Sequence, residues 1–266
     1  MEKITSCKNL KVIETAKLIH AKKRAEKGLF LADGIKLIYE LVKSDYEILT
    51  CFVKEGADLS VLPGSIDKSR IIIAGENVMN KISPLTNSQQ FIAVCRIKEQ
   101  APPDTKDSFI LALERIQDPS NLGAILRSAE AFGIKDIVLG NGCCDIYSPK
   151  ALRAAMGSTF RLNISYVQLC DFLTEKTRHG FDIIGTGLDK NYKTVDRLFE
   201  SEKKVVIIGN EGSGISKEIQ NLCSFGMYIP MYGENESLNA AVAASIIMWE
   251  NRRQNNERKP RNLDLA

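Results

Sequence analysis

The stretch FILALERIQDPSNLGAILRSAEAFG, residues 109–133, joins a continuous apolar run to an amphipathic segment through a short polar loop. The first part is typical of a buried strand, and the apolar side chains after the loop recur at helical spacing. Ser120 or Asn121 is a good N-cap for that helix. Arg127 lies off the apolar stripe, and taken alone it favours a surface ion pair with Glu130. The stretch therefore predicts a strand, a loop and a capped helix.

The same alternation continues toward the C-terminus. Apolar runs typical of strands occupy residues 109–116, 136–140, 181–188, 204–211 and 227–231. Helical patterns fall between and after them at 121–132, about 149–157, 168–178, a short turn after Ser216, and 237–253. Continuous apolar strands separated by helices indicate a parallel sheet covered on both faces. The sequence thus predicts the α/β fold class, with a parallel-sheet domain at 108–256.

A segment of different character precedes this domain. Residues 1–97 mix a basic helix with short strands and helices, predicted as follows: helix about 6–27, strand 28–34, helix 34–44, strands 48–55 and 70–75, a short helix 77–82 and a strand 89–97. The next ten residues, KEQAPPDTKD (98–107), have the composition of an exposed linker. We therefore expect a small α/β domain at 1–97, a linker at 98–107, and a basic tail at 257–266 after the larger domain.

The composition excludes several classes of protein. Hydrophobic residues make up 44% and charged residues 26% of the 266, as in soluble globular proteins. No apolar run approaches the roughly 20 residues that span a bilayer, and the N-terminus lacks the apolar centre of a signal peptide. We therefore expect a cytoplasmic protein without a membrane partner. Seven Cys without CxxC spacing and only two His predict reduced thiols, no metal site and no Ser-His-Asp triad.

Basic residues are concentrated in two segments, although the net charge is only +3. Residues 8–27 carry seven Lys or Arg against two Glu, and residues 252–261 carry five against one. Such clusters are more often solvated faces than binding sites, so charge alone leaves nucleic-acid binding open. The candidate nucleic-acid-binding residues are Lys22, Lys23 and Arg24 in the first of these segments, together with Lys150 and Arg153.

Three polar loops follow predicted strands: QDPSNLG (117–123), GNEGSGIS (209–216) and GENESLN (233–239). Ligands of parallel α/β sheets bind at the carboxyl ends of strands, on loops of this kind. The second loop has the spacing of a Walker motif, but Ile215 stands where the lysine belongs, and no GxGxxG follows the first strand. Each loop alone is explained by capping and turn formation, with Ser237 as the N-cap of the last helix. Three at one sheet edge predict a pocket for a polar small molecule.

Together the three loops resemble the motifs of the SpoU/TrmH branch of the SPOUT superfamily, S-adenosylmethionine-dependent RNA ribose 2′-O-methyltransferases. The matching text is ERIQDPSNLGAILRSAEAFG (114–133), VVIIGNEGSGIS (205–216) and IPMYGENESLNAAVAASIIMWENRRQ (229–254), with YSPKALRAAMGS (147–158) between them. The N-terminal segment more weakly resembles the family's small RNA-binding domain, itself similar to certain ribosomal proteins. One departure is Asp33-Gly34, where Glu-Gly is usual.

The resemblance implies a trefoil-knotted C-terminal domain, S-adenosylmethionine as cofactor and no metal. It also implies a homodimer through the C-terminal domain, whose active sites use residues of both chains. By motif, the cofactor would contact Gly209, Asn210, Gly214, Ile229, Met231 and Leu238. The catalytic surface would consist of Asn121, Arg127, Glu211, Ser237 and Asn239.

Methyl transfer to a ribose requires the weakly acidic 2′-hydroxyl to lose its proton as it attacks. Arg127 as general base is an unattractive assignment, because a guanidinium stays protonated in proteins. We prefer Arg127 as an electrostatic clamp for a phosphate and the developing alkoxide, Glu211 or a water as proton acceptor, and Asn121 orienting the hydroxyl. The separate N-terminal domain favours large-subunit ribosomal RNA over tRNA as the substrate. The alternatives are a tRNA methyltransferase, an RNA-binding paralogue without turnover, and a nucleotide-using enzyme of another doubly wound type.

Overall fold

The structure is a computed structural model that describes residues 1–85, 88–99, 101–103, 108–189, 191–234 and 237–255. The predicted tail at 257–266 and half of the predicted linker at 98–107 therefore lie outside the described residues. The chain divides into two compact units, each with its own sheet. The first consists of Met1–Glu99 with Asp145–Arg161, and the second of Gln100–Cys144 with Leu162–Ala266.

The first unit contains a mixed five-stranded sheet in the order β1-β4-β3-β5-β2. Its strands are β1 (Glu2–Ile4), β2 (Leu29–Asp33), β3 (Ile48–Lys54), β4 (Ile71–Ala74) and β5 (Phe91–Arg96). β5 runs antiparallel to both β2 and β3, and the β1–β4 and β3–β4 pairs are parallel. The four strands predicted from the sequence are confirmed. The short β1 was not predicted, because three residues are too few to show the alternation of polar and apolar side chains that distinguishes a strand from a loop.

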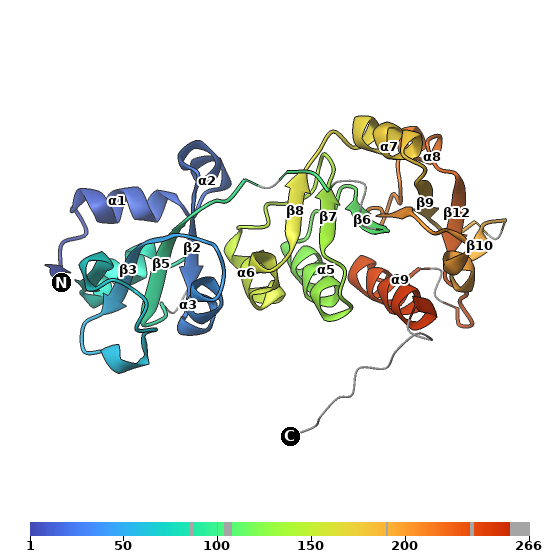
Figure 1. Cartoon of the computed structure of the whole chain (residues 1–266). Coiled ribbons are helices and arrows are strands. Elements are labelled where there is room, and N and C mark those ends of the chain that lie inside the picture. Colours follow the sequence, from blue (N-terminus) through green and yellow to red (C-terminus); the bar gives the residue numbers. More distant parts are fainter. Residues whose placement is uncertain (86–87, 100, 104–107, 190, 235–236, 256–266) are drawn as a thin grey trace, which may run out of the picture. The chain divides into compact units, whose positions relative to one another are not determined.

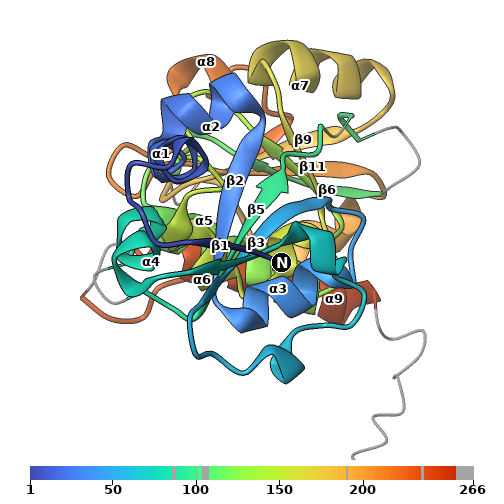
Figure 2. The ribbon, with the colours of Figure 1, turned by 90° about the vertical axis from the view of Figure 1, so that its left-hand side faces the viewer.

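Helices cover both faces of this sheet. They are α1 (Leu10–Lys17), α2 (Ala21–Lys27), α3 (Ile35–Val42), α4 (Glu76–Ile82) and α6 (Pro149–Ala155), with the short 3-10 helices η1 (Leu59–Val61), η2 (Lys68–Arg70) and η3 (Ser158–Phe160). α1 and α4 lie side by side, and their apolar side chains share one core cluster with β1–β5 (Figure 2). α3 and α6 contact β2.

The prediction of a single helix at about 6–27 is wrong, because the structure has two helices there. α1 begins after Asn9, whose side chain accepts a hydrogen bond from the Lys11 backbone N–H at 2.9 Å. It ends at Leu18, which is buried in the core, and α2 starts after His20. Packing of Leu18 thus ends the first helix in a run whose local helix propensity is uninterrupted.

The second unit contains a seven-stranded sheet in the order β10-β12-β9-β11-β6-β7-β8, with every pair parallel. Its strands are β6 (Phe109–Leu113), β7 (Asp136–Leu139), β8 (Asn163–Tyr166), β9 (Asp182–Thr186), β10 (Lys193–Thr194), β11 (Lys204–Ile208) and β12 (Phe225–Tyr228). The predicted parallel sheet is confirmed. β8 and β10 lie at the two edges of the sheet and were not predicted, because both are short. β8 alternates polar and apolar side chains over only four residues, and β10 consists of two polar residues.

The helices of this unit are α5 (Pro119–Ala131), α7 (Leu169–Arg178), α8 (Lys217–Gln220) and α9 (Ala240–Asn255), with the 3-10 helix η4 (Val195–Glu200). α5 and α9 pack together on one face of the sheet, and α7 and α8 cover the other (Figure 1). All five residues of β6 are buried, as expected for a central parallel strand covered on both faces. The trefoil knot implied by the resemblance stays a prediction.

Residues 145–161, which the sequence placed in the second domain, belong to the first compact unit. Arg24 forms an ion pair with Asp145 at 2.7 Å, and the hydroxyls of Tyr46 and Tyr147 lie 3.0 Å apart. The ring of Tyr147 also packs on Phe30, with centroids 4.7 Å apart. These buried contacts, distant in sequence, explain why local pattern did not reveal the assignment. Within the part of the chain that the structure describes, no helix is long and apolar enough to cross a bilayer.

Candidate functional site

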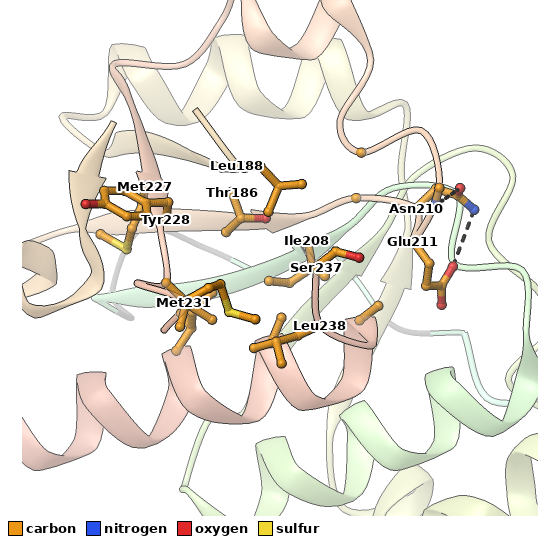
Figure 3. A pocket seen from close by; sticks show the side chains of 18 residues that line it. Thr186, Leu188, Ile208, Asn210, Glu211, Met227, Tyr228, Met231, Ser237 and Leu238 are labelled. Atoms are coloured by element: carbon orange, nitrogen blue, oxygen red, sulfur yellow. Dashed lines mark hydrogen bonds between the residues drawn. The ribbon is translucent and has the colours of Figure 1, made fainter. Parts of the chain in front are cut away.

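A pocket lies at the carboxyl ends of β9, β11 and β12, where two of the three predicted loops, 209–216 and 233–239, contribute to its lining (Figure 3). All six expected cofactor contacts line it: Gly209, Asn210, Gly214, Ile229, Met231 and Leu238. Of the expected catalytic residues, Glu211 and Ser237 also line it. The side chains of Ile208, Met231 and Leu238 make much of its wall apolar, which suits a purine ring, while the glycine loop presents backbone N–H and C=O groups.

The glycine loop, residues 209–214, holds its shape through internal hydrogen bonds. The backbones of Asn210 and Gly214 exchange two bonds of 3.1 and 2.9 Å. The Oδ1 of Asn210 accepts bonds from the backbone N–H groups of Gly212 and Ser213 at 3.0 and 3.1 Å. A Cβ at Gly209 would lie 2.4 Å from the backbone carbon of Gly214, so only glycine fits there. The side chain of Asn210 is therefore occupied in folding the loop, and its part in the pocket is indirect.

Three expected catalytic side chains form one hydrogen-bonded row beside the pocket. The Nδ2 of Asn121, in the first turn of α5, donates to the Oε1 of Glu211. The Nδ2 of Asn239 donates to the Oδ1 of Asn121 at 3.0 Å. These residues come from the loops after β6, β11 and β12, as the sequence predicted. Glu211 and Asn239 are exposed, so the row is open to a large substrate.

Both predicted helix caps are wrong. α5 begins at Pro119, two residues earlier than expected, and Asp118 caps it by accepting from the Ser120 backbone N–H at 2.9 Å. Asn239 precedes α9, and its Oδ1 accepts from the backbone N–H of Ala241 at 2.9 Å. The consequence is that the side chain of Asn121 is free to join the row, and Ser237 lines the pocket instead of capping a helix.

Arg127 is not brought to the pocket within this chain. It is exposed on α5 and does not line the cavity. Among the described residues it forms no hydrogen bond or ion pair, so the surface pair with Glu130 is absent. An exposed guanidinium without a protein partner is available to a ligand or to a second chain.

The five candidate RNA-binding residues have different surroundings in the first unit. Lys22, Lys150 and Arg153 are exposed. Lys23 pairs with Glu26 at 2.5 Å. Arg24 is only 4% exposed, and besides its ion pair it donates to the carbonyls of Leu18 and Ile19, both at 2.8 Å. The guanidinium of Arg24 is therefore buried and hydrogen-bonded within the protein. It is not available to RNA, and its role is structural.

Several pocket residues were not singled out from the sequence. They are Thr186, Gly187, Leu188, Ile208, Gly212, Met227, Tyr228, Ala243 and Ile247. Thr186 to Leu188 end a predicted strand, so the rule that ligands bind at carboxyl ends could have found them. The residues of α9 could not be found in this way, because their position under the pocket depends on how the helix folds back along the sheet.

Comparison with known proteins gives two family matches. The SpoU rRNA Methylase family matches residues 108–249, and the MRM3-like substrate binding domain matches residues 9–93. The chain is similar to the 23S rRNA (guanosine(2553)-2'-O)-methyltransferase RlmP of Bacillus subtilis, with 32% identity over 94% of this chain and 98% of that protein. It is 28% identical to a 23S rRNA (uridine(2479)-2'-O)-methyltransferase of Streptomyces viridochromogenes, over 87% of this chain and 85% of the relative.

Solved structures show the same architecture. An AdoMet-bound rRNA methyltransferase from Sinorhizobium meliloti has a TM-score of 0.83 and 27% identity, and the match covers 95% of this chain and 98% of that one. The SpoU methyltransferase AviRb from Streptomyces viridochromogenes, in complex with AdoMet, has a TM-score of 0.82 and 26% identity, with 93% and 98% covered. Both matches span the two units.

Proposed function

The chain belongs to the SpoU rRNA methylase family, and we propose that it methylates a ribose 2′-hydroxyl of large-subunit ribosomal RNA, with S-adenosylmethionine as methyl donor. The observation that carries this proposal is the pocket at the sheet edge, lined by every residue expected to contact the cofactor and bordered by the row Asn121–Glu211–Asn239. Relatives that span nearly the whole chain are named as 23S rRNA 2'-O-methyltransferases.

The residues present fit S-adenosylmethionine. The absence of a Cβ at Gly209 lets the glycine loop fold tightly onto the backbone of Gly214, which places the loop at the wall of the pocket. The apolar wall of Ile208, Met231 and Leu238 accommodates the adenine, and the backbone groups supply polar contacts. When bound, S-adenosylmethionine supplies a methyl group activated by its sulfonium. No protein nucleophile is required for such a transfer.

The remaining task of the protein is to orient the ribose hydroxyl and to take its proton. Glu211 is the carboxylate at the mouth of the pocket, and the bond from Asn121 fixes its orientation. We assign Glu211, directly or through a water, as the proton acceptor, and Asn121 with Asn239 as the groups that position the hydroxyl. Ser237, exposed at the pocket, is a further hydrogen-bonding group for the substrate.

Arg127 acts as the electrostatic clamp, and we propose that it does so in a homodimer. α9 exposes Val242 (47%) and Trp249 (54%), which are seven residues apart and share one helix face. Trp249 packs against Phe132 at the end of α5, with ring centroids 5.9 Å apart, so this apolar surface adjoins the helix that carries Arg127. A second copy seated here would bring the exposed Arg127 of one chain toward the partner's pocket.

The first unit serves as the RNA-binding domain, and the working compartment is the cytoplasm. Lys22, Lys23, Lys150 and Arg153 are its phosphate contacts, since each reaches the surface at least in part. Arg24 is left out of this assignment because it is buried. Two relatives modify different nucleotides of 23S rRNA, so the family fold does not determine which nucleotide is methylated. The guanosine at the RlmP position is the first nucleotide to examine.

The test compares nucleosides of 23S rRNA from a strain lacking the gene and from its parent. We expect one 2′-O-methylated nucleotide that is present only in the parent and that returns when the wild-type chain is supplied. The matched Gly209→Ala chain should not restore it, because its Cβ would collide with Gly214. Identical ribosomal RNA in the two strains contradicts the proposal, and a difference confined to tRNA supports the alternative substrate.

A further inference from the structure

Arg115 adopts a backbone conformation that side chains other than glycine rarely take. Its φ is 56°, and among the described residues it shares a positive φ with only one other non-glycine residue, Met156 at 51°. The left-handed region is unfavourable for a residue with a Cβ. Such a conformation persists where the surrounding contacts hold it, and it clusters near functional sites. The contacts of Arg115 therefore indicate what this conformation is for.

Those contacts hold the glycine loop at both of its ends. The Nη2 of Arg115 donates to the carbonyl of Gly214 at 3.2 Å. In the other direction, the backbone carbonyl of Arg115 accepts from the Nδ2 of Asn210 at 3.1 Å. Asn210 and Gly214 are the two residues whose backbones pair to close the loop. One residue outside the loop thus fixes both sides of its closure.

Neighbouring residues complete this arrangement. β6 lies between β11 and β7 in the sheet, so the residue after β6 can reach the loops that follow both neighbours. Gly142, in the loop after β7, leaves room for the Arg115 side chain, since a Cβ there would lie 2.9 Å from the Cγ of Arg115. The buried Glu114 accepts from the backbone N–H of Ser216 at 2.8 Å, just beyond the glycine loop.

We propose that Arg115 is a positioning residue for the cofactor, which holds the glycine loop in the shape that binds S-adenosylmethionine. Arg115 does not line the pocket, whereas Gly209, Asn210 and Gly214 do. It acts through the loop and touches neither the methyl donor nor the ribose. This inference rests on the proposed function, because it takes the pocket as the site of the methyl donor.

The test uses three variants of the full chain, with S-adenosylmethionine titrated by calorimetry and apo melting temperatures measured in parallel. Arg115→Gly keeps the positive φ without strain but removes the guanidinium. Arg115→Lys keeps a cationic donor. Met156→Gly is the matched control, since it relieves the same kind of backbone conformation at the end of α6 in the first unit.

We expect Arg115→Gly to raise the Kd for S-adenosylmethionine about tenfold, because the variant loses one charge-assisted hydrogen bond. The apo Tm should be unchanged or higher. In methylation assays its KM for the donor should rise similarly while kcat stays within about twofold. Arg115→Lys should bind within about threefold of wild type, and Met156→Gly should bind as wild type does.

An Arg115→Gly chain that binds S-adenosylmethionine as tightly as wild type overturns the inference. So does an apo Tm that falls together with the affinity, because the role of Arg115 would then be general stability. A wild-type chain that gives no heat with S-adenosylmethionine overturns the proposed function itself, which separates the two failures.

Discussion

Arg24 and Arg127 are the same residue type in two units of one chain, and the structure uses them in opposite ways. Arg24 comes from the most basic segment of the sequence, yet its guanidinium is buried against Asp145 and two backbone carbonyls. Arg127 comes from an amphipathic helix with few charges, yet it is exposed and has no partner among the described residues. The first unit uses polar side chains to hold its parts together, and the second gathers them at an open sheet edge. Burial and partners, and not local charge, separate the two roles.

The largest expected effect is that of Arg127→Ala on activity. Removing a group that stabilises developing charge costs about 10²–10³ in rate, so kcat/KM for RNA methylation should fall by that factor. The free energy of unfolding and the Kd for S-adenosylmethionine should stay unchanged, because the side chain forms no hydrogen bond or ion pair within the described chain. Arg178→Ala, at the exposed end of α7 on the opposite face of the sheet, is the control. Arg127→Lys with nearly full kcat would exclude a role for the planar guanidinium.

Arg24→Ala should have the opposite effect and reduce the stability of the fold. Removing one partner of a buried ion pair leaves an uncompensated group, so the free energy of unfolding should fall by about 3 kcal/mol. Urea unfolding measures this loss, and Lys22→Ala, on the exposed side of the same helix, should leave it unchanged. A stable Arg24→Ala chain with weakened RNA binding would show that Arg24 is a phosphate contact and that the contrast with Arg127 is wrong.

Lys204 tests whether burial decides the role of a cation in the second unit too. It is 4% exposed at the start of β11, and its Nζ donates to the Leu198 carbonyl at 2.9 Å. Burial lowers the pKa of Lys204 from 10.5 to about 8, although Asp182 offsets part of the effect. Between these values the unfolded chain binds one more proton than the folded chain, so stability rises with pH.

Relative to Lys204→Met, the free energy of unfolding of the wild-type chain should therefore rise by about 3 kcal/mol between pH 8 and pH 10.5. Urea titrations of both chains across this range measure the difference. Parallel pH profiles would mean that Lys204 keeps its proton in the folded state.

The smallest effect is expected for the exposed cations of the first unit. A chain with Lys22→Ala and Lys23→Ala should bind RNA only a few-fold more weakly, and the slope of log K against log salt should decrease by about 1 for each phosphate that is no longer neutralised. Filter binding at several salt concentrations measures the slope. Lys203→Ala, next to the start of β11 and away from the pocket edge, should leave it unchanged. The same slope in all three chains would remove α2 from the RNA surface.

Local pattern was sufficient for most of the second unit. The apolar strands, the order of the helices and the three loops were predicted, because a parallel sheet buried on both faces imposes apolar runs and places its loops at one edge. Contacts between distant residues were not predictable. Local sequence does not distinguish Asp118 from Ser120, or Asn239 from Ser237, as the N-cap of the helix that follows. The hydrogen bond between Asn239 and Asn121, which joins two distant loops, accompanies the caps that the structure shows.

The first unit shows the limit more clearly. The helix break at Leu18 and the burial of Arg24 follow from packing against strands and against residues 145–161, far away in sequence. A charge-rich segment gives the same local signal whether its arginine is solvated or paired. The position of Arg115 was equally hidden, since nothing in the letters around it indicates a positive φ.

The central claim is that the sheet-edge pocket of the second unit transfers a methyl group to a ribose. The most direct measurement incubates the purified chain with radiolabelled S-adenosylmethionine and 23S rRNA from a strain lacking the gene, then digests the RNA to nucleosides. We predict label in a single 2′-O-methylnucleoside with the wild-type chain and none with Gly209→Ala. Label on a base, or no transfer by the wild-type chain, would contradict the account.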